Sequence, residues 1–181
     1  MNRAASLPLR LLRGGGSSVL VAILLTGCSE PVPAQQVDQT VRTSQHHSYR
    51  ATTIVTGLEH PWSLAILPDG DMLVTERPGR LRMIRDGQLL AETVDGLPEI
   101  GAGGQGGLLD VVLHPEFATN RLVYLSYSKP GPDRTRTTAV IRGRLDGMRL
   151  TDVEEIFEAN AFTDRGQHFC SRILFDGNGY M

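Results

Sequence analysis

Lysine is nearly absent from this chain. Lys129 is the only one, and the other basic side chains are arginines scattered along the sequence. The formal net charge is -2 at pH 7. Without a cluster of positive charge, the sequence offers no electrostatic surface for the phosphate backbone of a nucleic acid. We therefore expect no nucleic-acid partner.

Long hydrophobic runs are also missing. The apolar run at residues 19–25 is too short to span a bilayer, and Arg3, Arg10 and Arg13 precede it. Basic residues followed by a short apolar run are typical of an export signal that is processed after translocation. We therefore read residues 1–28 as a signal peptide with its cleavage box.

Cysteine occurs only twice, at Cys28 and Cys170. Residues 25–28 read LTGC and resemble the bacterial lipoprotein box, whose cysteine becomes the lipidated first residue. An ordinary secretory signal with an incidental cysteine is the alternative. We favour lipidation of Cys28, because a leucine and a glycine precede it directly after the apolar run. Ser29 indicates the outer membrane, so we predict a lipid-anchored periplasmic protein with Cys170 as a free thiol.

Residues 29–48 are polar, without periodicity, and carry proline and glutamine. This composition is typical of a flexible tether between a membrane and a domain. From residue 49 onward, short apolar or β-branched runs alternate with Gly, Pro and Asp breaks, which favours an all-β fold. The expected strands are 52–55, 62–67, 72–75, 81–84, 89–94, 108–113, 122–127, 138–141, 153–157 and 173–175.

These strands form a repeating unit. The strand, turn and strand around Pro68 recur around Pro115 and begin again near Asp176. The spacing fits one four-stranded β-propeller blade with loop insertions, so residues 49–181 are expected to form about two and a half blades. Propellers close with about four to eight blades. We therefore expect an N-terminal portion of a longer protein, with closure by oligomerisation as the alternative.

One stretch combines residues suited to chemistry. Residues 166–172 read GQHFCSR, directly before the expected strand 173–175. A histidine with an unperturbed pKa of roughly 6.5 can accept a proton near neutral pH. If the strand begins early, an even spacing puts His168 and Arg172 on one face. From the residues alone, a structural role for this histidine remains open.

Five motifs occur together in order. They read GLEHPWSL at 57–64, VTERPGRL at 74–81, GGQGGLLD at 103–110, HPEF at 114–117 and GQHFCSR at 166–172. Together they resemble the soluble glucose/sorbosone dehydrogenases that use pyrroloquinoline quinone (PQQ), most closely the periplasmic aldose sugar dehydrogenase branch. The resemblance implies a six-bladed β-propeller with the quinone in a basic funnel at one end.

The resemblance also implies an activity and roles for residues. His168 matches the family's general base, which takes the proton of the sugar C1 hydroxyl while hydride passes to C5 of the quinone, giving the lactone. Gln105 matches a glutamine that lines the pocket beside cofactor and substrate. Arg172 matches a motif arginine, and a structural pairing with a neighbouring blade is its alternative role. A propeller that binds carbohydrate or a protein without redox chemistry is the alternative function.

Further expectations follow from the same resemblance. Calcium should accompany PQQ, with its ligands beyond residue 181, and an external quinone or cytochrome should accept the electrons. Two positions depart from the family pattern: Cys170 replaces a glycine, and Gln167 replaces the aspartate of the glucose dehydrogenase branch. We expect residues 29–181 alone to be inactive, because half a funnel does not enclose a cofactor.

Overall fold

Antiparallel strands make up almost all of the regular structure. The computed structural model describes residues 40–169 and 172–181, so the predicted signal peptide, Cys28 and Cys170 lie outside the described residues. Within these described residues there are two short helical turns, α1 (Phe117–Asn120) and a 3-10 turn at Pro132–Arg134. The strands are β1 (Val41–Thr43), β2 (Ser48–Arg50), β3 (Pro61–Ile66), β4 (Met72–Glu76), β5 (Arg80–Arg85), β6 (Gln88–Val94), β7 (Leu108–Leu113), β8 (Leu122–Pro130), β9 (Arg136–Asp146) and β10 (Arg149–Glu158).

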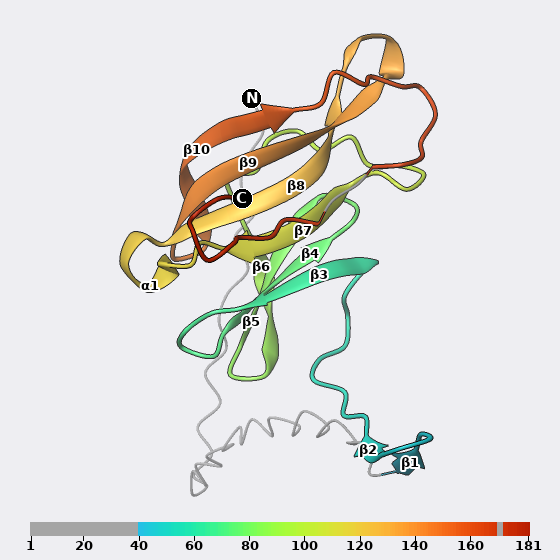
Figure 1. Cartoon of the computed structure of the whole chain (residues 1–181), viewed down its shortest axis with the longest axis vertical. Coiled ribbons are helices and arrows are strands. Elements are labelled where there is room, and N and C mark those ends of the chain that lie inside the picture. The colour runs from blue at the N-terminus through green and yellow to red at the C-terminus, as the bar shows by residue number, and fades with distance from the viewer. Residues whose placement is uncertain (1–39, 170–171) are drawn as a thin grey trace, which may run out of the picture. The chain divides into compact units, whose positions relative to one another are not determined.

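Two four-stranded sheets follow one another along the chain. The first is ordered β3-β4-β5-β6 and the second β7-β8-β9-β10, and neighbouring strands in each are antiparallel. Figure 1 shows the first sheet in green and the second in yellow to orange. Each sheet is a meander of consecutive strands, the arrangement of a propeller blade. The two complete repeats that the sequence predicts are therefore formed as blades, β3–β6 and β7–β10.

The residues of the turn account for the hairpin of β5 and β6. Arg85 pairs with Gln88 across the two-residue loop of Asp86 and Gly87, which both have positive φ. Two left-handed residues define the type I′ turn, whose twist matches that of the flanking strands. The Asp-Gly pair thus ends β5 and starts β6 as the sequence predicts.

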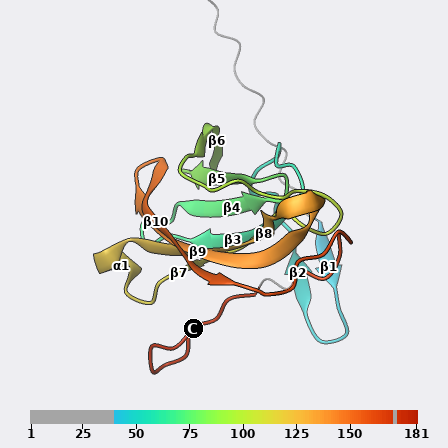
Figure 2. The same ribbon diagram turned by 90° about the horizontal axis from the view of Figure 1, so that it is seen from above.

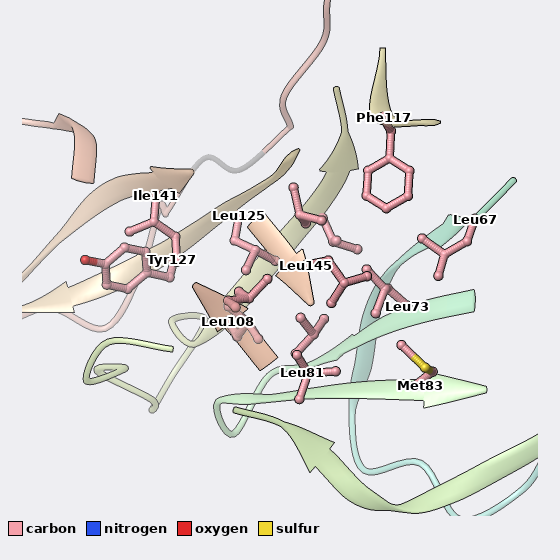
Figure 3. Close-up of a cluster of buried hydrophobic side chains, with 14 of the residues drawn as sticks. Leu67, Leu73, Leu81, Met83, Leu108, Phe117, Leu125, Tyr127, Ile141 and Leu145 are labelled. Carbon is pink, nitrogen blue, oxygen red and sulfur yellow. The ribbon is translucent and has the colours of Figure 1, made fainter. Parts of the chain in front are cut away.

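A shared apolar core joins the two sheets, which lie as adjacent layers in Figure 2. Strand alternation turns Leu73, Leu81 and Met83 of the first sheet toward Leu108 and Leu125 of the second, and Figure 3 shows these side chains meeting between the ribbons. All five are at most 1% exposed. Burying a side chain of this size stabilises the fold by about 1.5–3 kcal/mol, so this core fixes how the blades stack.

Hydrogen bonds also join the inner strands of the two blades. The Thr75 hydroxyl donates to the carbonyl of Leu109 at 2.6 Å and accepts the N–H of Ser63 at 3.0 Å. At the same end, the Leu108 N–H donates to the carbonyl of Arg77 at 3.1 Å. These contacts bring the ends of β3, β4 and β7 together, where the candidate site lies.

Two expected strands are not formed. Ile54 and Val55 line a cavity of about 380 Å³ with Leu64 and Val74, so the segment 52–55 faces the sheet instead of pairing along an edge. The segment 173–175 carries no strand either, because the N–H of Ile173 donates to a side chain and not to a ladder.

The predicted tether contains regular structure in its described part. The hairpin β1–β2 pairs Val41 with Arg50 and Thr43 with Ser48, and all of its residues are exposed. Among residues 40–169 and 172–181, no helix is long and apolar enough to cross a membrane.

Candidate functional site

A glycine-rich loop at residues 103–107 contributes Gln105 to the site. Gly104 has a φ of +59°, and an added Cβ there would overlap the carbonyl oxygen of Gly166. The next residue, Gln105, donates its backbone N–H to that same carbonyl at 2.7 Å. Only glycine combines this left-handed backbone with so close an approach. The loop is thereby joined to the segment that carries His168.

His168 is held by its backbone. Its φ is +64°, in the left-handed region, and its N–H donates to Oε1 of Gln105 at 2.9 Å. This conformation costs on the order of 1 kcal/mol in a residue other than glycine, so the hydrogen bond helps to maintain it. The condition under which His168 and Arg172 would share one face of an early-starting strand is not met, because the backbone of His168 is left-handed and residues 164–169 and 172–175 form no strand. The imidazole is exposed.

A cleft of about 380 Å³ lies beside this histidine. Its lining residues are Trp62, Arg77, Gln105, His168 and Phe169. Gln105 and His168, both predicted as site residues, therefore meet in one cleft. Arg77 is half-buried and donates from Nη1 to the carbonyl of Gly104, which fixes the guanidinium at the glycine loop. The cleft offers an aromatic wall, a fixed cation, an amide and an imidazole.

Arg172 lies on a neighbouring, wider cleft of about 1040 Å³ that also includes Trp62 and His168. Its Nη1 donates to Oδ1 of Asp110 at 3.0 Å, although its side chain is 67% exposed. Asp110 lies on β7 and is 1% exposed. The structure thus places Arg172 in a pairing with the preceding blade, the alternative that the sequence leaves open, and at the rim of the wider cleft.

A buried carboxylate, that of Glu76, lies at the end of β4 next to Arg77. Glu76, directly before Arg77, is fully buried and accepts from Arg80 at 2.5 Å and Arg82 at 3.3 Å. Burial raises its pKa, but hydrogen bonds from Arg80, from the backbone of Glu59 and from Arg82 together bring that pKa below the ordinary 4.5. The carboxylate is therefore ionised at neutral pH and holds the end of β4 in place.

Three residues of the site were not predicted as functional. Trp62 and Arg77 lie within the quoted motifs, and Asp110 ends one of them. A signal for Asp110 is present in the sequence, because it interrupts the apolar run LLDVVL. A charged residue inside a buried strand is rare unless it is paired. Among residues 40–169 and 172–181, no group of three or more His, Cys, Asp or Glu side chains is arranged to hold a metal ion.

Comparison with known proteins agrees with this architecture. Residues 58–181 match the family model described as Glucose / Sorbosone dehydrogenase. Aldose sugar dehydrogenase YliI of Escherichia coli (strain K12) is 47% identical over 127 residues, which cover 68% of this chain and 34% of that protein. The chain thus spans about a third of the length of this relative.

Solved structures give the same result. The apo-form of the soluble aldose sugar dehydrogenase from Escherichia coli aligns with a TM-score of 0.64 at 46% identity, covering 67% of this chain and 36% of that one. The PQQ-bound form of aldose sugar dehydrogenase from Streptomyces coelicolor aligns with a TM-score of 0.52 at 27% identity, covering 59% and 32%. The predicted all-β propeller fold is confirmed. These matches, together with the two blades, show that the chain belongs to the glucose/sorbosone dehydrogenase family.

Proposed function

We propose that the protein oxidises the C1 hydroxyl of aldose sugars to the lactone with pyrroloquinoline quinone as cofactor, and that His168 is the general base. The observation that carries the proposal is the placement of the His168 imidazole beside Gln105, Arg77 and Trp62 on one cleft. The family membership and the PQQ-bound relative support the choice of cofactor.

The residues of the cleft fit this cofactor. PQQ carries three carboxylates on a planar ring system, so it needs cations and a flat apolar wall. Arg77 supplies a guanidinium held at the glycine loop, and Trp62 and Phe169 supply aromatic surface. Among the described residues, no carboxylate lines this cleft. When bound, the quinone supplies the electron-pair acceptor that no side chain provides.

The side chains of the cleft have separate roles in the reaction. His168 accepts the proton of the C1 hydroxyl, while the hydrogen on C1 leaves with its electron pair and the C1 carbonyl forms. Gln105 uses Oε1 to hold the backbone of His168, and its amide NH2 can donate to a sugar hydroxyl. Arg77 fixes the position of a bound anion through its charge. The aromatic side chains exclude water from one side of the reacting carbon.

The proposal extends to location and partners, on the basis of the sequence. Lipidation at Cys28 would anchor the protein to the periplasmic face of the outer membrane, with residues 29–48 as the tether. Reoxidation of the cofactor needs an external quinone or cytochrome. Calcium is proposed to accompany the quinone. Mass spectrometry of the N-terminal peptide from membranes tests the lipid, and a mature protein without an acyl chain would contradict it.

The test of the activity is a reconstitution. The full open reading frame is expressed without its signal, PQQ and calcium are added, and dye reduction is followed with a panel of aldoses. We expect reduction that depends on both PQQ and an aldose, with the lactone as product. Absence of quinone binding would contradict the proposal and favour a propeller that binds carbohydrate or a protein partner.

A further inference from the structure

A buried carboxylate outside the cleft connects both blades to the segment of His168. Asp110 lies in the middle of the apolar strand β7 and is 1% exposed. Removing an ionised carboxylate from water is unfavourable unless donors replace the lost hydration. The carboxylate therefore needs hydrogen-bond partners, and these come from β3 and from the segment after His168.

Three donors reach the carboxylate. The Ser63 hydroxyl of β3 donates to Oδ1 at 2.6 Å, and Nη1 of Arg172 donates to the same oxygen at 3.0 Å. The backbone N–H of Ile173 donates to Oδ2 at 2.8 Å. The backbone N–H of Asp110 itself donates to the Ser126 hydroxyl of β8 at 3.0 Å. The first blade, the second blade and the segment after His168 thus meet at one residue.

The segment after residue 163 depends on such contacts. In its described part, residues 164–169 and 172–175, it forms no strand or helix. Side-chain acceptors hold its backbone instead: Gln105 takes the N–H of His168, and Asp110 takes the N–H of Ile173. One contact lies at the histidine and the other five residues beyond it. The segment is therefore held at the histidine itself and again on its C-terminal side.

We infer that Asp110 is a positioning residue, which holds the segment carrying His168 against the inner strands of both blades and so keeps the imidazole on the cleft. It acts through Arg172 and Ile173 and does not touch the cleft itself. The catalytic consequence rests on the proposed function, whereas the positioning is a property of the fold alone. The two claims can be tested separately.

The positioning is tested by hydrogen exchange on the protein from the full open reading frame, comparing wild type with Asp110→Asn. This change preserves the shape of the side chain but replaces one acceptor oxygen by a donor, so the contacts to Arg172 and Ile173 cannot both survive. We expect amide exchange in the peptide 164–175 to rise by about tenfold or more while β4 and β5 keep their protection. Asp164→Asn, an exposed carboxylate in the same segment, is the matched control.

Two results would overturn the inference. Unchanged amide exchange in 164–175 would show that the carboxylate does not hold the segment. An equal rise of exchange in β4 and β5 would show that Asp110 stabilises the core in general and not this segment. If Asp110→Asn does not fold, Arg172→Gln replaces it, because that side chain is 67% exposed and its loss leaves the core intact. The same local rise is then expected, and its absence counts against the inference.

Kinetics test the consequence for catalysis. A displaced base predicts that Asp110→Asn lowers kcat by about 100-fold, while KM changes by less than about threefold. A purely structural role would instead lower the amount of active protein and leave its kcat unchanged. If wild type shows no quinone-dependent turnover, the proposed function fails, and hydrogen exchange still decides whether Asp110 positions the segment.

Discussion

Two residues with left-handed backbone lie on the two segments that meet at the site. Gly104 has a φ of +59° and His168 a φ of +64°, and Gln105 bonds both to Gly166 and to His168. The glycine permits the approach of the two segments, and the amide side chain then holds the histidine in a conformation that it would rarely adopt alone. The hydrogen bond to Gln105 thus fixes the backbone that carries the imidazole.

Gly104→Ala tests this geometry, with Gly147→Ala as a control of nearly the same φ, +56°, and no atom within 4 Å of an added Cβ. Both alanines carry the left-handed penalty of about 1–2 kcal/mol, but only the first overlaps the backbone of Gly166. We expect similar losses in urea midpoint from that penalty, an additional loss for Gly104→Ala, and a fall in kcat of about tenfold or more for that variant alone. Equal effects on kcat would contradict the proposed contact.

Part of the site could be predicted from sequence. His168 and Gln105 follow from motif resemblance, and the structure brings them together. Asp110 could not be assigned a partner, because Ser63 and Arg172 lie far from it in sequence and meet it only when the blades stack. The role of Arg77 could not be predicted either, since its contact with Gly104 depends on the packing of a loop. Local sequence patterns do not reveal contacts between blades.

Among the elements, hairpins were predicted best and unpaired segments worst. The Asp86-Gly87 turn fixes its own register, so β5 and β6 follow from local chemistry. Residues 52–55 and 173–175 have the β-branched or apolar composition of strands, yet neither finds a neighbouring strand. Strand composition describes a side chain's fit to a sheet surface and not the presence of a pairing partner.

The strand pair β4–β5 carries a charge network at the end next to the site. Arg80 contacts both Glu76 and Glu59, and Arg82 reaches Glu76 as well. Since the pKa of Glu76 is held below 4.5 in the folded protein, the unfolded chain binds its proton at higher pH. The stabilisation is present above about pH 4.5 and is lost as pH falls through the folded pKa.

Glu76→Gln should therefore lower stability at pH 7 by about 1.5–3 kcal/mol and flatten the loss of stability below pH 4.5. Urea unfolding of the two proteins between pH 3 and 7 measures both effects. Glu99→Gln removes the same charge from an exposed position and serves as control. An equal pH dependence in wild type and Glu76→Gln would show that the network does not stabilise the folded state.

The site belongs to neither blade alone. The first blade contributes Trp62 and Arg77, the glycine loop that precedes the second contributes Gln105, and the segment that follows the second contributes His168. The shared core and the hydrogen bonds between inner strands hold these parts in register. A substitution that weakens the packing between the blades should therefore change the geometry of the site before either sheet unfolds.

Removal of the sugar C1 hydroxyl proton by His168 is tested by the kcat of His168→Ala with PQQ bound. We expect kcat for aldose oxidation to fall by about 10²–10⁴-fold, quinone affinity to stay within a few fold of wild type, and added imidazole to restore part of the rate. His46→Ala, an exposed histidine outside the cleft, should behave as wild type. A wild-type kcat in His168→Ala with the quinone bound would show that His168 is not the general base.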